Sequence, residues 1–124
     1  MLKTEEKQEM RKRNFKGRCT KRVIPKCKDV CRTYDALQEA YADKLSADDE
    51  VSEFRCNVYL EGLAEGDYTT DFVCTKSDGT LMIRECVYRS RLTKPMSYKL
   101  LEASREYWRH RGILDWGIVI NAEK

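Results

Sequence analysis

Two acidic residues, Asp71 and Glu85, are placed where they could bind one divalent cation. Each lies in a run of alternating polar and apolar residues, and an Asp-Gly pair at positions 78–79 separates the two runs. Such a pair between two alternating runs is typical of a β-hairpin, so the acids are expected on adjacent antiparallel strands. Carboxylates that project from one face of a sheet can hold Mg²⁺, which would polarise a phosphate and generate a hydroxide nucleophile. The pair therefore predicts metal-dependent phosphodiester hydrolysis, against the alternative of two solvated acids at strand ends.

The elements that would position these acids follow from the spacing of apolar residues. Segments with apolar residues at helical spacing alternate along the chain with segments of strand-like alternation, and the sequence contains no internal repeat. The predicted elements are a helix over Thr33–Leu45, strands over Val51–Leu60, Tyr68–Cys74 and Thr80–Tyr88, a helix from Pro95 that stops at Gly112, and a strand over Trp116–Ile120. This order predicts an α/β domain with a mixed sheet of about four strands flanked by helices. Glu39, on the first helix, is the best candidate for a third carboxylate.

Length and composition indicate one soluble domain with an appendage. The chain has 124 residues, of which 41% are hydrophobic and 36% are charged, so one core fits and disorder over the whole length is excluded. No run approaches the roughly 20 apolar residues that span a bilayer. Charged residues stand near the N-terminus where a signal peptide would be apolar. We therefore expect a cytoplasmic protein with no membrane partner.

The charge of the chain is divided unevenly. Residues 1–28 hold 11 Lys/Arg against three Glu, a balance of +8, whereas residues 29–124 hold 13 Lys/Arg against 18 Asp/Glu, a balance of −5. We interpret residues 1–28 as a partly disordered basic arm that contacts a phosphate backbone, and residues 29–124 as the α/β domain. A solvated leader without a ligand is the alternative. The candidate nucleic-acid-binding residues are Arg11, Lys12, Arg13, Lys16, Arg18, Lys21 and Arg22.

Six cysteines raise the question of a zinc site. Without an export signal they are expected to be reduced thiols. Cys19, Cys27 and Cys31 lie close in sequence, and a fourth thiolate could complete a tetrahedral site. The candidates for that thiolate are Cys56, Cys74 and Cys86. The chain offers no second closely spaced cysteine pair and only one histidine, so ordinary buried thiols are the favoured interpretation.

The segment Tyr68-Thr69-Thr70-Asp71-Phe72, followed after 12 residues by Glu85, resembles the Tyr-Thr-Pro-Asp-Phe … Glu-x-Lys core of PD-(D/E)xK nucleases. The C-terminal segments Lys99-Leu100-Leu101 and Trp116-Gly117-Ile118-Val119-Ile120 resemble the tail of the TnsA-like N-terminal domain, from the endonuclease subunit of heteromeric transposases. The likeness covers roughly Tyr34 to Ile120. It implies a restriction-endonuclease-like core and a mobile genetic element as the setting, with DNA and a transposase as partners. Asp71 and Glu85 would be ligands for Mg²⁺ or Mn²⁺, and Glu39 would be the helix acid.

One position departs from that pattern. The family has lysine two residues after the second acid, and this chain has Val87. The lysine orients the attacking water or offsets charge that builds on the phosphate. A nearby cation could replace it, and the candidates are Arg89, Arg91, Lys94 and Lys99. If none does, the chain is a catalytically inactive nuclease-fold module that acts as a DNA-binding, accessory or inhibitor protein.

Overall fold

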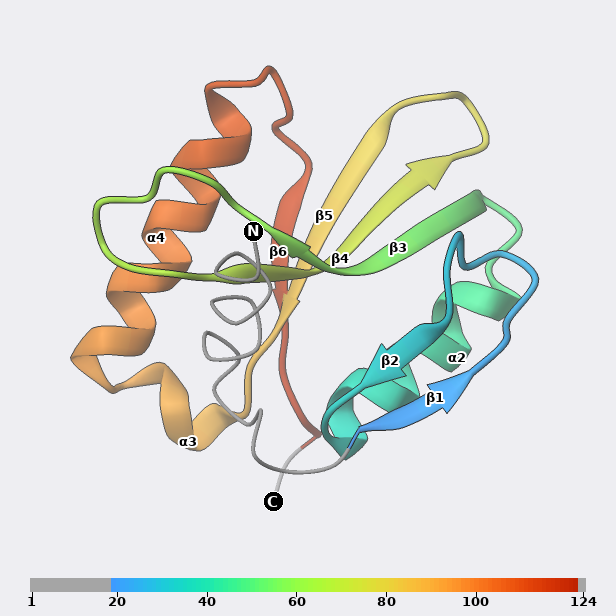
Figure 1. The fold of residues 1–124 in the computed structure, drawn as a ribbon, viewed down its shortest axis with the longest axis horizontal. Coiled ribbons are helices and arrows are strands. Elements are labelled where there is room, and N and C mark those ends of the chain that lie inside the picture. The colour runs from blue at the N-terminus through green and yellow to red at the C-terminus, as the bar shows by residue number, and fades with distance from the viewer. Residues whose placement is uncertain (1–18, 123–124) are drawn as a thin grey trace, which may run out of the picture.

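A four-stranded mixed sheet forms the centre of the computed structural model, which describes residues 19–122 (Figure 1). The strands lie in the order β3, β4, β5 and β6, with β3, β4 and β5 antiparallel and β6 parallel to β5. Their bounds are Val51–Tyr59 for β3, Thr69–Lys76 for β4, Leu81–Cys86 for β5 and Trp116–Val119 for β6. The expected α/β class with a mixed sheet of about four strands flanked by helices is confirmed.

Helices cover both faces of the sheet. Helix α2 (Ala36–Ala47) packs on one face through Ala42 and Leu45, which share a core with Phe54 and Phe72. Helix α4 (Pro95–Arg109) packs on the other face, where Trp108 shares a second core with Leu60, Tyr68 and Ile83. A short helix, α3 (Arg89–Leu92), connects β5 to α4. No helix within residues 19–122 is both long and apolar enough to cross a membrane.

Local signals explain where these elements begin and turn. The Asp35 side chain accepts a hydrogen bond of 2.8 Å from the Gln38 N–H, which caps α2. Pro95 occupies the first turn of α4, where its missing N–H costs nothing. The turn between β4 and β5 places Gly79 at φ 91°, a left-handed conformation that favours glycine. The Asp-Gly pair thus forms the hairpin turn that brings β5 back beside β4.

A hairpin of β1 (Thr20–Arg22) and β2 (Cys31–Thr33) precedes α2 and was not predicted. Because Thr33 belongs to β2, the helix begins three residues later than expected. Residues 20–28, which the sequence analysis placed in the basic arm, include β1 and the buried Cys27. Packed structure therefore begins before residue 28. Lys21 and Arg22 lie in β1, while the arm residues Arg11, Lys12, Arg13, Lys16 and Arg18 lie outside the described residues.

Candidate functional site

Asp71 and Glu85 lie at the end of the paired region of β4 and β5. Main-chain pairing between these strands reaches Phe72 and Arg84, and the two acids follow directly. The Cys86 N–H donates to Asp71 Oδ2 over 2.7 Å, and the Asp71 N–H donates to Glu85 Oε1 over 3.0 Å. The acids are 1% and 0% exposed, so both carboxylates are inside the molecule. Here carboxylate oxygens accept the main-chain hydrogen bonds that carbonyl groups accept farther along the hairpin.

Each carboxylate is held by a different helix. Gln38 of α2 donates from Nε2 to Asp71 Oδ1 over 2.9 Å. Ser104 of α4 donates from Oγ to Glu85 Oε2 over 2.7 Å, and Trp116 Nε1 donates in turn to Ser104 Oγ over 3.0 Å. Gln38 and Ser104 come from the helices that cover opposite faces of the sheet, and their hydrogen bonds hold both carboxylates in the buried position.

Burial changes the proton affinity of Glu85. The loss of water around its carboxyl group, together with the negative charge of Asp71, raises the Glu85 pKa to about 7 from an ordinary 4.5. Hydrogen bonds from the Asp71 N–H, Ser104 and Tyr68 act in the opposite direction and are outweighed. Near neutral pH the Glu85 carboxyl group is therefore partly protonated. A divalent cation bound by both carboxylates would neutralise the same charge.

The raised pKa predicts that the metal-free protein loses stability as pH rises. The folded state holds the Glu85 proton up to about pH 7, whereas the unfolded chain releases it near 4.5. The free energy of unfolding should therefore fall across that window, by on the order of 3 kcal/mol, and should level off above it. Urea unfolding in EDTA between about pH 5 and about pH 8 measures this slope. Glu85→Gln should flatten it, and an equal slope in the variant would assign the effect to other groups.

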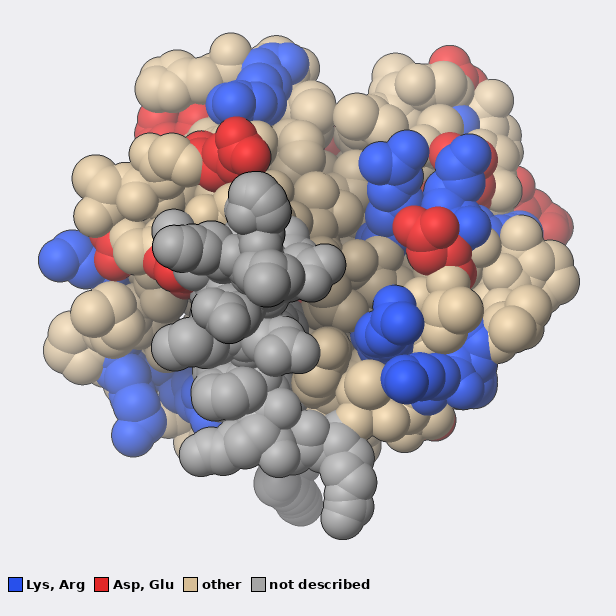
Figure 2. All heavy atoms as spheres, viewed as in Figure 1, with Lys and Arg blue, Asp and Glu red and all other residues tan. Residues whose placement is uncertain are grey.

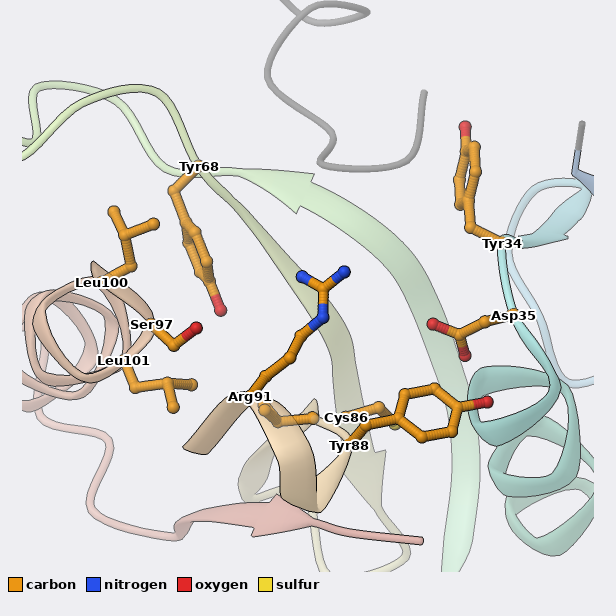
Figure 3. A pocket seen from close by; sticks show the side chains of 10 residues that line it. Tyr34, Asp35, Tyr68, Cys86, Tyr88, Arg91, Ser97, Leu100 and Leu101 are labelled. Carbon is orange, nitrogen blue, oxygen red and sulfur yellow. The ribbon is translucent and has the colours of Figure 1, made fainter. Parts of the chain in front are cut away.

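A cavity of about 320 Å³ adjoins the pair (Figure 3). Tyr68 and Cys86 line it and also contact the acids, since Tyr68 hydrogen-bonds Glu85 and the Cys86 main chain donates to Asp71. The remaining lining residues are Tyr34, Asp35, Val87, Tyr88, Arg91, Ser97, Leu100 and Leu101. Tyr68 thus stands between Glu85 and a space large enough for a small polar ligand.

The four cations that could replace the missing lysine occupy different places in the structure. Val87 lines the cavity, and the Arg91 guanidinium points into it between Tyr68 and Asp35 (Figure 3). Lys99 lines a separate groove beside the β3–β4 loop. Neither Arg89 nor Lys94 is among the described residues that line either space. Of the four candidate cations, Arg91 is therefore the one that lines this cavity together with Val87 in the described part of the chain.

The helix residue that reaches Asp71 is Gln38, one position before the expected Glu39. Glu39 lies in the first turn of α2, where a negative charge complements the helix dipole. The expected place of Glu39 as the third carboxylate stays a prediction. The spacing of Gln38 to Ala42 and Leu45 marks it as a residue of the buried stripe. That spacing could have identified it.

Ser104 and Thr70 are further polar residues that sequence reasoning did not assign. Ser104 is fully buried and stands four residues before Trp108 on the apolar stripe of α4, so its position signalled a polar contact inside the molecule. Thr70 stands where the nuclease motif has proline, and its Oγ accepts a hydrogen bond of 3.0 Å from Trp108 Nε1. Proline could not accept that bond, so the threonine has a defined role in joining β4 to α4.

A second group of metal-ligating side chains lies elsewhere. The Sγ atoms of Cys27, Cys31 and Cys56 lie within 4.8 Å of one another and could hold a metal ion. Neither Cys19, Cys74 nor Cys86, which the sequence analysis also considered, is part of this group in the described chain. The thiols suit a softer ion than the carboxylate pair does.

Comparison with known proteins identifies no relative: no family model and no curated protein matches the chain. The resemblance to TnsA-like nucleases therefore stays a prediction that depends on the motif residues. The function has to be argued from the arrangement of the buried acids, the cavity and the charged surface.

Proposed function

We propose that this chain is a DNA-binding protein with a TnsA-like PD-(D/E)xK nuclease fold, from a mobile genetic element, that hydrolyses phosphodiester bonds with Mg²⁺ or Mn²⁺. The observation that carries the proposal is the buried Asp71–Glu85 pair at the end of the β4–β5 hairpin. Two carboxylates in a water-excluded position cost folding free energy, and apolar residues of similar volume often stabilise a fold as well or better. A pair kept in that position is best explained by a ligand that needs it, and a divalent cation is the ligand that carboxylates bind.

The surrounding residues have separate tasks in this proposal. Asp71 and Glu85 would hold the cation, and Gln38 and Ser104 keep the two carboxylates in place through hydrogen bonds of 2.9 and 2.7 Å. The cation would polarise the scissile phosphate and favour formation of the attacking hydroxide. Arg91, which points into the adjoining cavity, would offset charge that builds on the phosphate oxygens.

The β1–β2 hairpin supports the DNA-binding part of the proposal. Lys21 and Arg32 are exposed and lie directly opposite each other in the strand register. Like charges in that position destabilise a hairpin unless an anion neutralises them. Figure 2 shows Lys and Arg side chains gathered over this hairpin. Residues 1–18, which precede it in the chain, carry seven further Lys/Arg.

Removal of residues 1–18 should weaken DNA binding and reduce its salt dependence. Each phosphate that a cation neutralises contributes about −0.9 to the slope of log affinity against log salt. Loss of seven Lys/Arg and three Glu should therefore make the slope less negative by several of these increments. Fluorescence anisotropy with a labelled duplex at several salt concentrations measures the slope. An unchanged slope in the truncated protein would exclude the arm as the main contact.

A catalytically inactive nuclease-fold module, acting as a DNA-binding, accessory or inhibitor protein, is the second candidate. Val87 favours it, because an apolar side chain at the lysine position can neither orient water nor offset charge. The burial of both acids favours it as well, since neither side chain is open to solvent. In this case DNA binding persists and no metal produces cleavage.

Nicking of supercoiled plasmid in Mg²⁺ or Mn²⁺ separates the two candidates. The wild type should nick, and Asp71→Asn should reduce the rate to background while circular dichroism shows a folded protein. Asp49→Asn makes the same chemical change at an exposed residue of the α2–β3 loop and should leave the rate unchanged. Wild-type protein that binds DNA without nicking it under either metal would leave the second candidate standing.

A further inference from the structure

Three cysteines from separate segments converge on one side of the sheet. Cys27 lies between β1 and β2, Cys31 begins β2, and Cys56 lies in β3. The Sγ atoms of Cys31 and Cys56 are 3.5 Å apart, and those of Cys27 and Cys56 are 3.8 Å apart. Cys27 and Cys31 are buried, and Cys56 is partly exposed. Their core is the one that α2 covers.

These separations match the edges of a tetrahedral metal–thiolate site. With a zinc–sulfur bond of about 2.3 Å, two thiolates on one Zn²⁺ lie about 3.8 Å apart. We propose that Cys27, Cys31 and Cys56 bind Zn²⁺ as thiolates, with water in the fourth position. Binding replaces three thiol protons with the ion, so the protons are released to solvent. Cys56 is the member of the group that is partly exposed.

Metal binding at this group has to overcome the cost of removing protons from buried thiols. Burial, and the neighbouring thiols, raise the pKa of Cys56 well above its ordinary value, and burial raises the pKa of Cys27 in the same direction. Because the ion has to displace the protons, its affinity should rise with pH. The two sites also differ in softness, since thiolates select Zn²⁺ and carboxylates select Mg²⁺.

The ion would fasten the β1–β2 hairpin to the sheet. Each of these strands has only three residues, and a hairpin that short is marginally stable by itself. Two main-chain hydrogen bonds already join the loop to β3: Phe54 N–H to the Lys26 carbonyl at 2.9 Å and Lys28 N–H to the Phe54 carbonyl at 3.0 Å. Zinc would add a link between the loop, β2 and β3. The anchored hairpin carries Lys21 and Arg32, so the site would position basic residues relative to the body of the protein.

The test begins with the metal content of wild-type protein purified without chelator, for which we expect about one zinc ion per chain. Substitution with Co²⁺ should give an absorption band from thiolate-to-metal charge transfer and the intense visible bands of tetrahedral cobalt. Cys31→Ser and Cys56→Ser should each lose the ion. Cys74→Ser is the control, because Cys74 is equally buried in the same core but lies outside the group of three.

Two further results decide the proposal even if a serine variant does not fold. Removal of zinc from the wild type should increase hydrogen exchange in residues 20–33 and leave β4 protected, which locates the effect at the hairpin. Wild-type protein that takes up no zinc and gives no cobalt–thiolate band would overturn the site and leave three buried thiols. Ion binding that persists in Cys31→Ser or Cys56→Ser would place the ion elsewhere. These outcomes do not depend on nuclease activity.

Discussion

Arg91→Ala should reduce metal-dependent nicking by about 100- to 1,000-fold, the loss that follows removal of one electrostatic group from a charged transition state. Arg91 points into the cavity that Val87 also lines, where the family's lysine would project. DNA affinity should change much less, because residues 1–28 carry a net charge of +8 whereas residues 29–124, which include Arg91, sum to −5. Plasmid nicking and anisotropy on the same protein preparations measure the two effects separately.

Val87→Lys in the Arg91→Ala background should restore much of the lost activity. Val87 follows Glu85 by two residues, so a lysine there is placed where the family's lysine stands, beside the same cavity. The single variants Arg89→Ala, Lys94→Ala and Lys99→Ala are the controls, because none of these cations lines that cavity. Normal activity in Arg91→Ala would exclude Arg91 as the replacement. A loss in Lys94→Ala or Lys99→Ala would assign the role to that lysine.

Divalent cations should stabilise the folded protein strongly. A ligand at about 100 times its dissociation constant adds about 2.7 kcal/mol to the free energy of unfolding, which raises Tm by about 10 °C for a domain of this size. The cation competes with the proton on Glu85, whose pKa is about 7, so the shift should be larger at about pH 8 than at about pH 6. Asp71→Asn should abolish the shift. Thermal unfolding with Mn²⁺, Mg²⁺ or EDTA measures it.

The control for this experiment is Asp49→Asn, which leaves the buried pair intact and should respond to Mn²⁺ as the wild type does. Added Zn²⁺ has to be tested separately, since Cys27, Cys31 and Cys56 offer it a different set of ligands. An equal Mn²⁺ response in wild type and Asp71→Asn would place the cation away from Asp71.

The β4–β5 hairpin could be predicted from the sequence because its signals are local. The Asp-Gly turn and the alternation on either side fix the register that sets Glu85 beside Asp71. Apolar residues at helical spacing likewise predicted the positions of α2 and α4 to within a few residues. Local signals do not predict that both carboxylates are buried. Their burial depends on hydrogen bonds from Gln38 and Ser104, which belong to helices on opposite faces of the sheet.

The parts that were missed depend on contacts between distant segments. Strands β1 and β2 have three residues each, too few for alternation to be recognised, and they form because Cys27 and Cys31 pack against β3. Glu39 was predicted as a carboxylate on the first helix, whereas the rotation of α2 on the sheet decides which side chain points inward, and Gln38 donates to Asp71. The sequence could name Arg91 only as one of several cations able to replace the motif lysine. Its place in the lining of the cavity distinguishes it from the other candidates.

Crystals soaked in Mn²⁺ and measured for anomalous scattering test the central claim most directly, because they locate the ion without reference to turnover. We expect an anomalous peak between Asp71 and Glu85, with a carboxylate oxygen from each at bonding distance and Tyr68 moved from its contact with Glu85. An absence of density there, with the Gln38–Asp71 and Ser104–Glu85 hydrogen bonds unchanged at high Mn²⁺ concentration, would contradict the assignment of this pair as a cation site.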